Sequence, residues 1–256
     1  MRLLLSLVCL SFSVLVCPFT YSQSPTPSQP PTLSAFQEKA LTAVTGGKPV
    51  QSVKLDATAE WTAGSLHTSG AADLQANTDG SSRVQLSLGQ SSRTETQTKA
   101  DASRTCQWID ASGTSHNIVG PNCFVSIPWF APGLFTQPAS LLPALIGTTD
   151  DGEVSKTGSD FHQISYLLNL DGIDSASTTT LVDQSRVKVL YDPQTFLPSS
   201  LEYAIHPDDN DLQSLEVKVV FSDYRSVSGV MLPFHIEKFI NRSLQIKLDI
   251  NNASIE

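Results

Sequence analysis

The chain contains 256 residues, of which 40% are hydrophobic and 16% are charged, and its 25 acidic side chains outnumber its 16 basic ones. The apolar content is sufficient for a sizeable core and excludes a wholly disordered chain. The formal net charge of -9, without a block of basic residues, argues against nucleic acid as the main partner.

The N-terminal segment has the pattern of a secretory signal peptide over residues 1–22. A single positive charge at Arg2 precedes a mostly apolar run, Leu3–Val16, and Pro18 interrupts this run before it reaches the roughly 20 residues that a spanning helix needs. Small residues near Ser22 suit cleavage there, so we expect an exported protein with no stable transmembrane span after cleavage. A lipid anchor on Cys17 is the weaker alternative, because bulky residues directly precede that cysteine.

Two cysteines, Cys106 and Cys123, remain after removal of the predicted signal peptide. An even number of cysteines in an exported chain favours a disulfide bond, which here would close a short loop. A redox-active or metal-binding pair is the alternative, but the spacing matches neither a CxxC motif nor a zinc-binding template.

A helix is predicted after a Pro/Ser-rich tether at residues 23–31. Ser34 and Gln37 have the spacing of a capping box, in which each side chain satisfies a backbone amide of the first turn. Gly46 and Gly47 predict the end of this helix, since glycine adopts the left-handed cap without a steric penalty.

Beyond the helix, hydrophobic residues alternate with polar ones at the period of two that is typical of half-buried strands. The pattern predicts strands over residues 53–61, 66–77, 84–88, 94–98, 105–109, 152–158, 161–168, 179–191, 199–206, 213–224, 231–240 and 243–251. The strand at 94–98 is polar on both faces, with threonines alternating with Glu95 and Gln97. Because the strands follow one another without helices between them, they predict a mainly β, antiparallel fold.

Some alternating positions are candidates for the concave wall of this sheet, although the strand register decides which face they occupy. These positions are Val53, Leu55, Trp61, Val84, Leu86, Val217 and Phe221.

Residues 121–147 break the alternation and predict a helical insertion within a single domain that covers residues 32–256. Pro138 suits the first position of a short helix and Gly147 its end. The apolar and aromatic residues of the insertion either fill the core or form a mobile lid or lining for a lipid. Together with Trp61, the residues predicted to line such a site are Trp129, Phe130, Phe135, Leu141 and Leu142.

The C-terminal half resembles the outer-membrane lipoprotein-sorting superfamily, the LolA/LolB-like group. The resemblance lies in Val189–Pro198, which contains an Asp-Pro turn, in Phe221–Phe234, and in a last strand that ends at Asp249–Asn251. It implies a strongly curved, unclosed antiparallel barrel whose open side is covered by helices. It also implies a hydrophobic cavity that receives acyl chains in the periplasm of a Gram-negative bacterium.

The leading hypothesis is therefore an exported, non-catalytic protein that binds a lipid or the acyl moiety of a lipoprotein, with neither a cofactor nor a metal. Known carriers of this group have basic residues at the mouth of the cavity. The candidates here are Arg83, Arg93, Arg104 and Arg186, and the sequence does not single out one of them.

Two other functions remain open. The same fold could act as an envelope sensor or scaffold that binds a protein partner, for instance by strand addition at a sheet edge. A hydrolase would need a Ser-His-acid arrangement, and none of the five histidines lies in a recognised motif. The acidic run Asp208–Asp211 suggests calcium, but a solvated hairpin tip is favoured because the run lacks the glycine and the closing glutamate of a calcium loop.

Overall fold

We analysed a computed structural model of the protein. It describes residues 34–100, 103–118, 121–124, 128–136, 145–168, 186–207 and 213–256. The predicted signal peptide, the tether and the acidic run Asp208–Asp211 lie outside these ranges.

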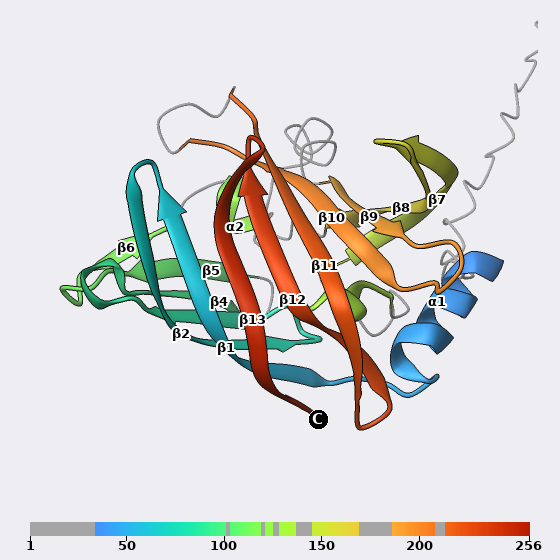
Figure 1. Cartoon of the computed structure of the whole chain (residues 1–256), viewed down its shortest axis with the longest axis horizontal. Coiled ribbons are helices and arrows are strands. Elements are labelled where there is room, and N and C mark those ends of the chain that lie inside the picture. Colours follow the sequence, from blue (N-terminus) through green and yellow to red (C-terminus); the bar gives the residue numbers. More distant parts are fainter. Residues whose placement is uncertain are drawn as a thin grey trace, which may run out of the picture.

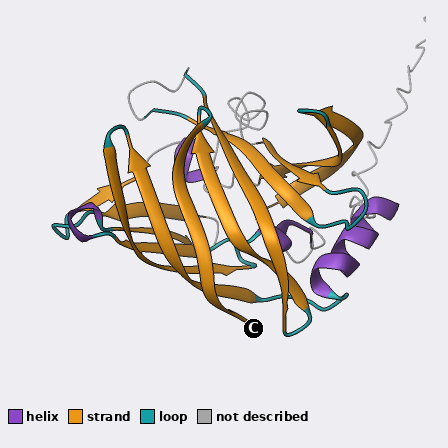
Figure 2. Ribbon diagram, viewed as in Figure 1, coloured by secondary structure: helices purple, strands orange, loops and turns teal. Residues whose placement is uncertain are grey.

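Antiparallel strands dominate the structure and form one curved sheet of thirteen strands (Figures 1 and 2). The strands of the N-terminal half are β1 (Ser52–Ala63), β2 (Leu66–Asn77), β3 (Ser82–Ser87), β4 (Arg93–Ala100), β5 (Ser103–Ile109) and β6 (Ser115–Asn117). Those of the C-terminal half are β7 (Leu145–Lys156), β8 (Ser159–Leu168), β9 (Arg186–Tyr191), β10 (Pro198–Ile205), β11 (Leu215–Val227), β12 (Val230–Ile240) and β13 (Ser243–Ile255). The helical elements are α1 (Ala35–Thr45), α2 (Pro121–Phe124) and the 3-10 turns η1 (Gly89–Ser91) and η2 (Pro132–Thr136).

The strand order shows how the chain builds an open barrel. From one edge to the other the order is β6-β5-β4-β3-β2-β1-β13-β12-β11-β10-β9-β8-β7, so β1 and β13 join two meanders at the centre. Strands β6 and β7 form the two edges and do not pair with each other. The predicted antiparallel, unclosed sheet is therefore confirmed.

The segment between β6 and β7 has to pass from one edge of the sheet to the other. In its described part, Trp129, Phe130 and Leu134 are buried and belong to the same core cluster as the sheet residues. The described part of this segment thus packs against the inner face of the sheet.

A helix was expected to begin at Pro138 and end at Gly147, and the prediction of its C-terminal end is wrong. Gly147 belongs to β7, which starts at Leu145 rather than at residue 152, while residues 137–144 lie outside the described part of the chain. The pairing of β7 with β8 shifts register between Leu145 and Gly147 and again between Asp150 and Gly152. These irregularities interrupt the alternation by which a strand is recognised in a sequence.

Helix α1 has the predicted caps. The Ser34 hydroxyl accepts a hydrogen bond from the Gln37 amide at 3.2 Å, and the Gln37 side chain accepts one from the Ser34 amide at 2.7 Å. Gly46 ends the helix in the left-handed conformation, with φ 61°. On the buried side, Phe36 stacks on His162 of β8 with ring centroids 3.6 Å apart, which holds the helix against the C-terminal half of the sheet.

The predicted wall positions lie on one face. Six of them are buried in the main core cluster, and Trp61 is half-buried against it. The structure thus places these positions on the inner face of the sheet, a choice that the alternation alone left open. The alternation missed β6, whose three residues are too few to show a period.

Candidate functional site

A partly enclosed cavity of about 270 Å³ lies between the inner face of the sheet and the crossing segment. Its apolar wall consists of aromatic and branched side chains from both halves of the sheet and from the crossing segment: Trp61, Val84, Trp108, Ile118, Trp129, Phe130, Tyr203, Ile205, Ile240 and Ile246. All three tryptophans of the chain belong to this wall. The volume is close to the lower end of the range of small-molecule sites, about 300 Å³.

The rest of the lining is mainly polar and includes three inward-facing side chains of β4. Arg93, Glu95 and Gln97 are two residues apart, so they project from the same face of the strand. Arg93 forms an ion pair with Glu95, with 2.7 Å between nitrogen and oxygen. Its guanidinium also lies 5.5 Å from the ring centre of Trp61 and 4.8 Å from that of Trp108, within the range of cation-π attraction.

A second cation, Lys238 of β12, faces this wall from across the cavity. Its register partner on β11 is the buried Val219, which places the Lys238 side chain on the inner face. Its ammonium nitrogen lies 4.6 Å above the ring centre of Trp129. Lys238 is half-buried, and desolvation by the surrounding protein lowers its pKa below the usual lysine value, although Glu95 opposes this effect. A register shift directly after Lys238 reshapes the strand pairing at this point.

Tyr203 adds a neutral hydroxyl group to the lining. Burial raises the pKa of this phenol, and the negative charge of Glu95 raises it further. The hydroxyl therefore stays protonated at neutral pH, and the charged members of the lining are Arg93, Glu95 and Lys238.

A disulfide bond and an asparagine hold the crossing segment across the cavity. Cys106 of β5 is bonded to Cys123 of α2, with 5.4 Å between their Cα atoms, so the predicted disulfide is confirmed. The neighbouring Asn122 bonds both backbone groups of His206, which follows β10: its Oδ1 accepts from the amide at 2.8 Å and its Nδ2 donates to the carbonyl at 2.5 Å. Helix α2 thus connects the N-terminal half of the sheet to the C-terminal half.

The structure brings three of the predicted site residues together. Trp61, Trp129 and Phe130 line the cavity, and the latter two are buried. Phe135 lies in η2 but its side chain is outside the described part, as are Leu141 and Leu142. These placements leave the binding role of the predicted residues a proposal.

Among the candidate arginines, only Arg93 is in the cavity lining as far as the side chains are described. Arg83 lies on the outer face and pairs with Asp73 at 3.2 Å, Arg186 lines a separate depression, and the side chain of Arg104 is not described. Sequence reasoning did not identify Glu95, Gln97, Trp108 or Lys238 as site residues. The signal that could have found the first two is the polar character of β4 on both faces, because a strand of an open barrel must turn one face inward.

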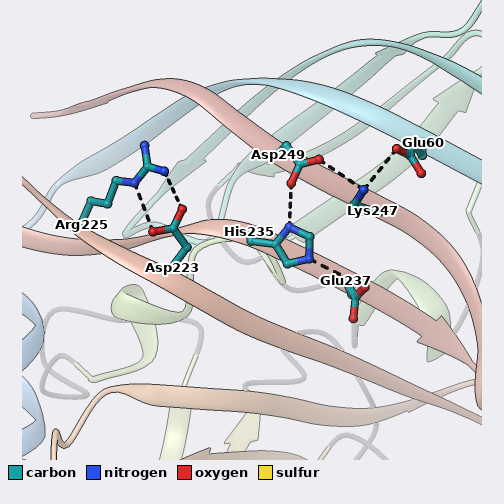
Figure 3. A network of polar contacts seen from close by, with 7 residues as sticks. All are labelled: Glu60, Asp223, Arg225, His235, Glu237, Lys247 and Asp249. Carbon is teal, nitrogen blue, oxygen red and sulfur yellow. Dashed lines mark hydrogen bonds and ion pairs between the residues drawn. The ribbon is translucent and has the colours of Figure 1, made fainter.

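A different polar network occupies the outer face of the sheet (Figure 3), and none of its residues lines the cavity. His235 Nδ1 lies 2.6 Å from Asp249, and Lys247 bridges Asp249 and Glu60 at 3.5 and 3.2 Å. The hydrogen bond from His235 is the largest of the effects that lower the pKa of Asp249.

Histidine-carboxylate pairs occur elsewhere, but they lack the third member of a triad. In the described ranges, His116, His162 and His235 each contact an aspartate, and no serine hydroxyl hydrogen-bonds to their rings. The same ranges contain no group of three histidine, cysteine or acidic side chains able to hold a metal ion. None of the helices in them is long and apolar enough to cross a membrane.

No family model matches this sequence, and no curated protein matches it either. Solved structures do share its fold. A DUF1329 family protein from Desulfovibrio piger has a TM-score of 0.52 at 12% identity over 87% of this chain and 92% of its own. A putative outer membrane lipoprotein-sorting protein domain from Vibrio parahaemolyticus has a TM-score of 0.51 at 7% identity, covering 86% and 91%.

A LolA superfamily protein from Nitrosomonas europaea likewise has a TM-score of 0.51 at 12% identity, covering 87% of this chain and 92% of its own. Identities this low establish the fold and carry no residue-level function. They confirm that the chain has the fold of the LolA superfamily, which its sequence resembles.

Proposed function

We propose that this protein is an exported, non-catalytic carrier that binds the acyl chain of a lipid or lipoprotein in the cavity of its open barrel. The observation that carries the proposal is the cavity of about 270 Å³ between sheet and crossing segment. A core that was simply filled by the insertion would leave no space larger than a few water molecules, each of which occupies about 30 Å³.

The physical reason for such a cavity is the poor solubility of acyl chains. Each methylene group transferred from water to an apolar wall gains about 0.8 kcal/mol, so a chain of several methylenes binds with useful affinity. The tryptophans and isoleucines of the apolar wall supply that surface. The disulfide supports export, because such bonds persist in oxidising compartments such as the periplasm.

The test is uptake of a fluorescent fatty-acid probe, combined with native mass spectrometry of protein purified without detergent. Ile240 lines the cavity, whereas the adjacent Phe239 lies outside the lining, on the outer face of the same strand. We expect Ile240→Asp to lower probe affinity at least about 10-fold, because a carboxylate on the apolar wall must be desolvated when the chain enters. Phe239→Asp is the matched control and should leave affinity unchanged.

A protein without bound lipid and without probe uptake would contradict the carrier function. The alternative with a protein partner, as an envelope sensor or scaffold, would then be favoured.

A further inference from the structure

The polar wall of the cavity contains a buried amide group that has no partner. Gln97 is 3% exposed, and both its Nε2 and its Oε1 lack a hydrogen bond. Buried amides normally form hydrogen bonds, because a buried amide without a partner loses its hydrogen bonds to water and gains none in return. The Nε of Arg93, on the same face of β4, is also buried and unpaired. Both residues line the cavity, so a small rotation of either side chain would bring an unpaired donor to a bound ligand.

The charges of the lining do not cancel. Among the described residues of the lining, Arg93 and Lys238 carry two positive charges and Glu95 carries one negative charge. Glu95 is engaged by Arg93 at 2.7 Å, whereas Lys238 has no carboxylate within ion-pair distance among the described residues. A site with a net charge of one positive unit, enclosed by apolar side chains, attracts an anion more strongly than an exposed site does.

Together these groups and the apolar wall match one class of ligand. We infer that the cavity binds an anionic single-chain amphiphile whose head group is held inside, between Gln97 and Arg93 on β4 and Lys238 on β12. The acyl chain then contacts Phe130 and Ile246. This inference rests on the proposed function and adds the position and charge of the head group.

The shared chemistry of the head group is a cluster of anionic oxygens, either a carboxylate or a phosphate. The Gln97 amide nitrogen and the Arg93 Nε donate hydrogen bonds to these oxygens, and the Lys238 ammonium donates as well as neutralising charge. The volume of about 270 Å³ corresponds to about nine water volumes, so the enclosed part of the ligand is a medium-length chain or a section of a longer one.

The experiment titrates the ligand-free protein with four ten-carbon amphiphiles: decanoate, decyl phosphate, decanol and decyltrimethylammonium. Because all three tryptophans line the cavity, intrinsic fluorescence reports entry directly. We expect both anions to bind about 10-fold or more tightly than decanol, as charge-assisted hydrogen bonds do. The ratio of the two anion affinities distinguishes carboxylate from phosphate.

The decisive variant is Lys238→Met, which keeps the aliphatic length and removes the charge. It should lower the affinity for decanoate and decyl phosphate about 10-fold and leave that for decanol unchanged. Lys218→Met is the matched control, since Lys218 lies on the neighbouring strand β11 and its register partner Phe239 faces outward. Circular dichroism establishes whether both variants fold. If Lys238→Met does not fold, Gln97→Met tests the same head-group site.

The possible outcomes distinguish failure of the head-group site from failure of the proposed lipid-binding function. Equal affinities for decanol and the anions, or unchanged anion affinity in both Lys238→Met and Gln97→Met, would overturn the head-group site while leaving a lipid cavity. Tighter binding of decyltrimethylammonium than of decanoate would also overturn it. Failure of all four amphiphiles to bind would refute the proposed function itself.

Discussion

Replacing Gln97 by methionine should stabilise the ligand-free protein, which is the reverse of the usual effect of a substitution in a core. The side chain is buried, and both of its polar atoms are unpaired. Methionine has a similar length and no group that requires a partner, and its flexible thioether adapts to the adjacent space. The variant therefore removes a desolvation penalty without creating a large cavity.

The size of this effect follows from the energy of an unpaired buried polar group, about 1–3 kcal/mol. Some of that gain is offset by imperfect packing of the thioether, so we expect an increase of about 1–2 kcal/mol in the free energy of unfolding. For a chain of this length, that corresponds to a rise in Tm of roughly 2–8 °C.

Thermal unfolding followed by circular dichroism measures the change, with and without saturating decanoate. Decanoate should raise the Tm of the wild-type protein more than that of Gln97→Met, because only the wild type has an amide that can bind the head group. The control is Gln75→Met on β2, an exposed position where the change should stay within about 0.5 kcal/mol. If Gln97→Met had a lower Tm than the wild type and decanoate raised its Tm as much, the amide would be neither unpaired in the free protein nor a ligand for the head group.

Three further predictions concern the frame of the cavity and the outer face. Replacing Cys106 and Cys123 by serine should lower the free energy of unfolding by about 3 kcal/mol in urea titrations, and an unchanged midpoint would contradict this. Asn122→Ala removes two hydrogen bonds that hold α2 to the end of β10, so it should lower the free energy of unfolding by about 2 kcal/mol and speed probe release in stopped-flow measurements. An unchanged release rate would mean that these hydrogen bonds do not control the release of the probe. Because His235 lowers the pKa of Asp249, the stability gained from this carboxylate is present at neutral pH and lost as pH falls through the lowered pKa. Asp249→Asn should therefore be less stable than the wild type by about 0.5 kcal/mol at pH 7, and this difference should vanish in strong acid. A difference that persisted in strong acid would show that it does not come from the charge of Asp249.

The sheet could be predicted because its signal is local and periodic. Val53 and Leu55 alternate with polar residues over a long strand, and Ser34 with Gln37 forms a cap that needs only four consecutive residues. Bulges and long-range contacts have no such signal. Strand β7 was predicted to begin too late because its register shifts twice, and the short β6 shows no period at all.

The site was harder to predict because it assembles from strands that lie far apart in the sequence. Arg93 and Lys238 are 145 positions apart, and the pairing of β1 with β13 joins their halves of the sheet. Nothing in the sequence near Arg93 distinguishes it from Arg83. In the structure, Arg83 faces outward and pairs with Asp73. The direction in which a strand faces is a property of the folded sheet, so the choice among the arginines required the structure.

The residues that build the fold differ from those that would set the proposed ligand preference. Three structures with at most 12% identity share this fold, so the fold tolerates wide sequence change. Strand β4 turns Arg93, Glu95 and Gln97 inward, and the unpaired, buried amide of Gln97 lowers the stability of the ligand-free protein. Because an unpaired buried amide opposes folding, a ligand that pairs with Gln97 would account for the position of this side chain on the cavity wall. If Lys238→Met and Gln97→Met each stabilise the free protein and weaken anion binding, the wall serves recognition at the expense of stability.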